Sequence, residues 1–221
     1  MNETKITITE LPGDHGIDDL IRSKMKPGET VVGIPDHEGA SPGLDALVRA
    51  SNWKRAGFRV LMQLNCRDRN RIDLAGRYLG ALALGLDYIV IVTGLHTSLG
   101  TVPEAKPVYD LDPIQTMSYL RTIEPFDKKA RSGPMTGIRT HVQNRDEFEL
   151  NRLKRLLETR PDFLLIHSNH HIQNLAAWIN HCSQVPGLDQ TSLFFEMQSE
   201  AIADNNTIDL PELITGLYLK Y

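Results

Sequence analysis

The chain has 221 residues, of which 41% are hydrophobic and 24% charged, and its formal net charge is −4. This is the composition of a folded globular protein, and it excludes a disordered chain and a protein built mainly to coat nucleic acid or an anionic membrane. No apolar run reaches about 18 residues, so no transmembrane helix is predicted. No signal peptide is recognisable. The two cysteines, Cys66 and Cys182, exclude a disulfide framework and favour a cytoplasmic location.

Short β-rich runs recur along the chain and predict seven strands. The run at residues 88–92 (YIVIV) is continuously apolar, which is typical of a strand buried on both faces. The segment 211–219 fits either an eighth strand or a helix. The predicted strands are residues 5–9, 30–34, 58–64, 88–92, 135–141, 163–167 and 192–197.

Helical patterns separate these strands. In the segment 44–55, for example, Leu44, Leu47 and Val48 follow helical spacing and the pattern stops at Gly57. Pro113 occupies the favoured first position of another helix. The predicted helices are residues 18–25, 44–55, 71–84, 113–123, 146–159 and 172–181.

Alternating strands and helices predict parallel strands joined by crossover helices. No G-x-G-x-x-G run follows the first strand, which argues against a dinucleotide-binding fold. The sequence therefore predicts a single domain over residues 1–221, an α/β fold of the (β/α)8 TIM-barrel type that is compact or partly trimmed at its C-terminus.

Catalytic residues of such barrels lie at the carboxyl ends of the strands. This rule gives the candidate site residues directly, as the polar or small residues that end each predicted strand. They are Glu10, Asp36, His37, Gln63, Asn65, Cys66, Thr93, Gly94, His141, His167 and Glu196.

Other clusters have simpler explanations. His167, His170 and His171 do not share one helical face, so no metal site is predicted. The polar run at residues 67–71 (RDRNR) is interpreted as a capping turn before a helix, rather than as an anion site. Cys66 is expected to pack in the core, and Tyr109 either stacks on a flat ligand or is an ordinary half-buried tyrosine.

Two segments have distinctive amino-acid sequences. Residues 64–94 read LNCRDRNRIDLAGRYLGALALGLDYIVIVTG, and residues 105–112 read AKPVYDLD. Together with ITELPGDHG, VVGIPDHEG and PDFLLIH elsewhere in the chain, they resemble the methylenetetrahydrofolate reductase family. The fold of that family is a TIM-like barrel, in agreement with the alternation of elements.

The resemblance implies an oxidoreductase of one-carbon metabolism. It would reduce 5,10-methylenetetrahydrofolate to 5-methyltetrahydrofolate, or catalyse the reverse oxidation, with Glu10 as the general acid that protonates the ring nitrogen. NAD(P)H would supply hydride, either through FAD or FMN or directly. Gln63 stands where the family has histidine and Leu95 where it has aspartate, which leaves the flavin open. The implied folate or cofactor contacts are Gln63, Asn65, Thr93, Gly94, Tyr109 and His167.

The competing hypothesis is a folate-binding relative or subunit without reductase activity. A third reading is a folate-dependent one-carbon enzyme that uses the same pocket. In each case the expected partner is a small-molecule folate and not nucleic acid or membrane. Assembly as a homo-oligomer or with a partner subunit stays open.

Overall fold

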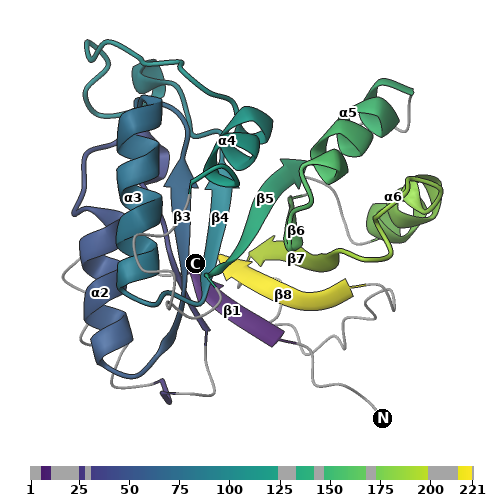
Figure 1. Cartoon of the computed structure of the whole chain (residues 1–221), viewed down its shortest axis with the longest axis horizontal. Helices are drawn as coiled ribbons and strands as arrows, with labels where there is room; N and C mark the ends of the chain where they lie inside the picture. The colour runs from purple at the N-terminus through teal and green to yellow at the C-terminus, as the bar shows by residue number, and fades with distance from the viewer. Residues whose placement is uncertain are drawn as a thin grey trace.

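The computed structural model describes residues 6–10, 25–27, 31–123, 133–141, 147–167, 173–198 and 214–220. Eight parallel strands pair in sequence order and close a barrel, in which β8 returns to β1 (Figure 1). The strands are β1 (Ile6–Glu10), β2 (Val31–Ile34), β3 (Arg59–Asn65), β4 (Tyr88–Val92), β5 (Met135–His141), β6 (Phe163–His167), β7 (Ser192–Gln198) and β8 (Ile214–Lys220).

The parallel barrel predicted from the alternation of elements is confirmed, and the ambiguous C-terminal segment is a strand. Helices follow β2 to β6, so the eightfold β/α repeat itself stays a prediction. The predicted helix at residues 18–25 falls, apart from Met25, outside the described residues. The described helices are α2 (Ala46–Arg55), α3 (Arg71–Ala83), α4 (Pro113–Leu120), α5 (Glu147–Glu158) and α6 (Gln173–Cys182), with short 3-10 turns η2 (Glu38–Ala40) and η3 (Thr97–Leu99). None of these helices has both the length and the apolar character needed to cross a bilayer.

Helix boundaries are set by side-chain caps. Asp45 accepts a hydrogen bond from the Leu47 N–H and starts α2, two residues later than the sequence pattern predicts, because Leu44 lies before the cap. Asn70 caps α3 by accepting from the N–H groups of Ile72 and Asp73. Asp112 and Gln115 form a reciprocal capping box on α4. Each cap satisfies backbone donors that have no partner within the helix.

Alternation along the strands separates two cores. Side chains that point outward pack under the helices, whereas inward-pointing side chains fill the barrel. Aromatic rings occupy part of the interior: Phe163 lies edge-on to Tyr88 at 6.2 Å and to Phe194 at 5.4 Å. The interior cluster consists of Val31, Leu61, Tyr88, Val90, Val92, Phe163, Leu165 and Phe194.

Gly137 leaves the room that Phe163 needs. A Cβ atom on residue 137 would lie 2.4 Å from the Phe163 ring, so Gly137→Ala is expected to destabilise the fold by about 1–3 kcal/mol through overpacking. Gly76→Ala is the matched control, because a Cβ atom there meets nothing within 4 Å and the helix α3 should gain roughly 1 kcal/mol. Urea unfolding measures both effects, and equal midpoints for the two variants would contradict this account of the interior.

Candidate active site

A polar cluster occupies the carboxyl end of the barrel interior, above the apolar layers. His141, His167 and Glu196 lie on β5, β6 and β7, and they are direct register partners across these three strands. Arg139 lies two residues before His141 on the same face of β5. Four ionisable side chains therefore lie together at the carboxyl ends of the strands, where parallel barrels have their active sites.

Short contacts connect this cluster. The Arg139 guanidinium donates from Nη2 to Oε1 of Glu196 at 2.7 Å, and the same oxygen lies 3.2 Å from Nδ1 of His167. Glu196 is 6% exposed, so its carboxylate is shielded from bulk water. A buried carboxylate between an arginine and a histidine balances positive charge on either partner.

His141 completes the cluster at its outer edge. Its ring lies edge-on to that of His167, with the centroids 5.0 Å apart. Burial lowers the pKa of His141 below its ordinary value of 6.5, and the neighbouring charges of His167, Arg139 and Arg152 lower it further, against an opposing effect of Glu196. The His141 imidazole is therefore neutral at physiological pH, which is the form that accepts a proton.

A second polar network, on the outer side of β5, holds the end of this strand. Arg152 of α5 donates to Oγ1 of Thr140 at 2.6 Å and to the carbonyl oxygen of His141 at 3.3 Å. Its guanidinium also pairs with Glu149, which is 1% exposed. The helix thus fixes the backbone on which His141 is carried.

Across the barrel, the ends of β2 and β3 are joined by a buried ion pair. Arg69 contacts both carboxylate oxygens of Asp36, at 2.8 and 2.9 Å, and the two side chains are 4% and 2% exposed. Asp36 also accepts from the backbone N–H of Asn65, and the Asn65 amide donates back to the carbonyl oxygen of Asp36. This network fixes the inward-pointing Asn65 at the mouth of the barrel.

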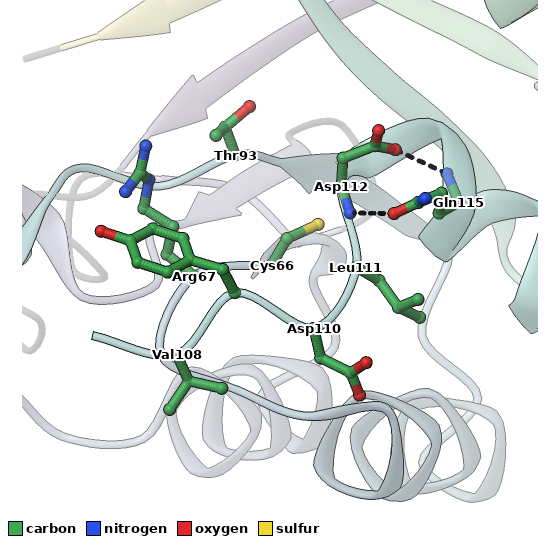
Figure 2. Close-up of a pocket in the computed structure, with 9 residues that line it drawn as sticks. Cys66, Arg67, Thr93, Val108, Asp110, Leu111, Asp112 and Gln115 are labelled. Carbon is green, nitrogen blue, oxygen red and sulfur yellow. Dashed lines mark hydrogen bonds between the residues drawn. The ribbon is translucent and has the colours of Figure 1, made fainter. Parts of the chain in front are cut away.

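A pocket of about 300 Å³ opens beside β3 and β4, between the loops that follow them and the start of α4. Figure 2 shows Arg67 and Thr93 on one side of Cys66, and Asp112 and Gln115 on the other. Cys66 contacts the hydroxyl of Thr116 at 3.3 Å, and burial raises the pKa of its thiol to about 11. Cys66 is therefore a packed thiol, as expected from the sequence. The pocket is lined by Cys66, Arg67, Thr93, Val108, Tyr109, Asp110, Leu111, Asp112 and Gln115.

Gly94 shapes the wall of this pocket. Its φ of +80° is one that L-residues with a side chain rarely adopt. A Cβ atom there would lie 3.2 Å from Cβ of Arg67 and 3.3 Å from the Asn65 amide, so glycine allows the loop to pass over both.

The predicted site residues do not all meet. Gln63 and Asn65 point into the barrel and His167 belongs to the polar cluster, whereas Thr93 and Tyr109 line the separate pocket. Glu10 ends β1 opposite Gly33, and its side chain lies outside the described part of the structure. His141 and Glu196 were candidates from the strand-end rule and are brought together with His167.

Arg139 is the residue of this polar cluster that the strand-end rule missed. It lies one inward position below the end of β5 and reaches upward to Glu196. The sequence feature that could have revealed Arg139 is the two-residue period of a strand, which places Arg139 and His141 on the same face of the sheet. Among the described residues, no group of three histidine, cysteine or acidic side chains is arranged to hold a metal ion.

No family model matches the chain, and no curated protein matches it. Solved structures do match over nearly its whole length. Orotidine 5'-phosphate decarboxylase from Lactobacillus acidophilus is 10% identical with a TM-score of 0.59, covering 98% of this chain and 90% of the other. Oxaloacetate acetylhydrolase is 12% identical with a TM-score of 0.61, covering 98% and 75%. Phosphonopyruvate hydrolase in complex with oxalate and Mg²⁺ is 14% identical with a TM-score of 0.59, covering 97% and 75%.

These findings overturn the predicted family. The chain is not assigned to the methylenetetrahydrofolate reductases, because no family model supports that membership and the matching barrels include decarboxylase, hydrolase and mutase structures. The predictions of an oxidoreductase, of a tetrahydrofolate substrate and of NAD(P)H as hydride donor were wrong for the same reason, and FAD or FMN, which the resemblance left open, has no support. The folate-binding and one-carbon alternatives have no support either.

The segments that carried the resemblance have a structural role that explains their composition. Arg71 forms a two-pronged ion pair with Asp110, and Asp68 accepts from the backbone N–H of Val108, while Asn70 caps α3. The run at residues 67–71 and the segment 105–112 therefore hold each other in place, and the capping interpretation is confirmed for Asn70. What the comparisons show is the fold: the chain is a TIM-type parallel barrel.

Proposed function

We propose that the protein is an enzyme of the lyase or mutase type that acts on a small organic acid by proton transfer at the carboxyl end of the barrel. The observation that carries this proposal is the contact of Arg139, Glu196, His167 and His141 inside the mouth. An arginine, a buried carboxylate and two imidazoles are the groups that acid–base chemistry on an anionic substrate requires.

The roles follow from the geometry. Glu196 balances positive charge on His167, and neutral His141 beside it accepts a proton from the substrate. Nε of Arg139 is buried and has no hydrogen-bond partner among the described residues. The guanidinium, which is paired with Glu196 through Nη2, therefore keeps one further N–H donor for a carboxylate or enolate oxygen on which negative charge develops.

The structural neighbours support the substrate class. Two of the similar barrels are named for oxaloacetate and phosphonopyruvate, which are 2-oxo acids, and the second was solved with oxalate and Mg²⁺. The described residues of this chain do not fit Mg²⁺, which prefers several oxygen ligands. Glu196 is held by Arg139, and Asp36 is held by Arg69. No step is assigned to a metal here.

The same proposal extends to architecture and partners. We infer a complete (β/α)8 barrel as one domain over residues 1–221, a cytoplasmic location and a small-molecule substrate, with neither nucleic acid nor membrane as partner. The modest net charge of −4 supports the choice of partners. Self-association or a partner subunit stays a prediction.

The test is turnover of a panel of 2-oxo acids that includes oxaloacetate and phosphonopyruvate, with and without Mg²⁺, followed by NMR. Arg139→Gln is expected to lower kcat/KM by about 10²–10³ on any substrate that is turned over. Arg155→Gln is the matched control, since Arg155 is exposed on α5, and it should leave kcat/KM unchanged. An inert panel, or equal losses in the two variants, would contradict the proposal.

A further inference from the structure

The pocket beside β3 and β4 is separate from the acid–base cluster. Cys66 and Thr93 each follow an inward-pointing residue, Asn65 and Val92, and so they face the outside of the strand ring. Cys66 belongs to the outer core under the helices. A ligand in this pocket would therefore lie between β3, β4 and α4, and not inside the barrel.

Arg67 provides a positive charge in this pocket. Its guanidinium carbon lies 4.9 Å from the centre of the Tyr109 ring, which holds it by a cation–π contact. Within the described part of the chain, no carboxylate pairs with this guanidinium, and its buried Nε has no hydrogen-bond partner. An arginine in this state is suited to bind an oxyanion.

The two carboxylates in the wall are already engaged elsewhere. Both oxygens of Asp110 are held by Arg71, at 2.8 and 3.1 Å, which keeps the pKa of Asp110 at about 2. Asp112 accepts from the backbone N–H of Gln115 at 2.7 Å as the cap of α4. Neither side chain compensates the charge of Arg67.

The rest of the pocket lining is suited to the apolar part of a small organic ligand. Val108 and Tyr109 are 39% and 60% exposed, so they present apolar surface, and Leu111 adds to the same lining. The exposed Thr93 adds a hydroxyl on the side of the pocket where Arg67 lies (Figure 2). The volume of about 300 Å³ is at the lower end of ligand pockets.

We propose that this pocket is a second binding site, which takes a small organic oxyanion. The carboxylate or phosphate of the ligand lies on Arg67 and Thr93, and its apolar or aromatic body rests on Tyr109 and Val108. The site goes beyond the proposed acid–base function and does not depend on it, because none of its residues belongs to the cluster of Arg139, His141, His167 and Glu196.

The experiment is equilibrium binding of benzoate and phenyl phosphate, with benzylammonium as a probe of opposite charge. Calorimetry on the full chain gives Kd, and methyl NMR locates the ligand. We expect saturable binding of at least one anion, with shifts of the Val108 and Leu111 methyl signals and none at Leu164 in the outer core. A preference for phenyl phosphate over benzoate would identify a phosphate ligand, and the reverse a carboxylate.

Arg67→Gln is expected to raise Kd by about tenfold or more, in keeping with loss of a charge-assisted contact. Thr93→Val should give a smaller rise. Arg55→Gln, on the exposed end of α2, is the matched control and should leave Kd unchanged. Absence of binding, tighter binding of benzylammonium, or an unchanged Kd in Arg67→Gln with a wild-type circular dichroism spectrum would overturn the proposal. Each readout is independent of 2-oxo acid turnover.

Discussion

Arg69→Met is expected to lower the free energy of unfolding by about 3–5 kcal/mol, because it removes one partner of a buried ion pair. The guanidinium of Arg69 contacts both oxygens of Asp36, and the two side chains are 4% and 2% exposed. Removing the arginine leaves a carboxylate that is shielded from water, with the backbone N–H of Asn65 at 3.0 Å and the His37 ring at 3.9 Å as its remaining polar neighbours. Urea unfolding at neutral pH measures the loss.

Two further variants separate charge burial from loss of contacts. Asp36→Leu combined with Arg69→Met removes both charges, so it should be less destabilising than Arg69→Met alone. Arg71→Met changes the same residue type two positions along, where the pair with Asp110 is exposed, and its effect should be much smaller. If Arg69→Met and Arg71→Met had the same midpoint, the buried pair would not have the role assigned to it.

The barrel could be predicted well because the sequence patterns that specify its strands and helices are local. The apolar run 88–92 and the cap residues Asn70 and Asp112 act within a few positions of the chain, and the structure has β4, α3 and α4 at these places. The ends of the seven predicted strands lie within one residue of those in the structure, so His141, His167 and Glu196 could be predicted as strand-end residues. The contacts among these side chains could not be predicted, because they depend on the register between strands that are far apart in sequence.

The functional prediction failed for a related reason. Segments 64–94 and 105–112 were interpreted through a family resemblance, yet their polar residues pair with each other: Arg71 with Asp110, and Asp68 with the backbone of Val108. The contacts between Arg71 and Asp110 and between Asp68 and Val108 hold the two loops together and do not identify a substrate. Arg139 was missed because it lies inside a strand and reaches the site through the length of its side chain.

Loss of the His141 imidazole is expected to have the largest effect on activity. His141→Gln should lower kcat/KM by about 10²–10⁴ on a 2-oxo acid that the wild-type protein turns over, since it removes the neutral proton acceptor of the cluster. His96→Gln, on the loop after β4, is the matched control and should keep wild-type kcat/KM. If both variants retained full activity, His141 would not be the base.

The pH dependence tests the same assignment more sharply. Burial and the charges of His167, Arg139 and Arg152 hold the pKa of His141 below 6.5, so the acid limb of kcat/KM should have its midpoint below pH 6.5. Glu196 is the neighbour that raises this pKa, so in Glu196→Gln the acid limb should move to still lower pH.

The free energy of unfolding should also depend on pH through the titration of His141. The unfolded chain binds more protons than the folded one between the lowered pKa and 6.5, so the free energy of unfolding should decrease as the pH falls through this window. His141→Gln should reduce that decrease, because glutamine does not titrate. An acid limb of kcat/KM above pH 6.5, or one that moves upward in Glu196→Gln, would show that a different group accepts the proton.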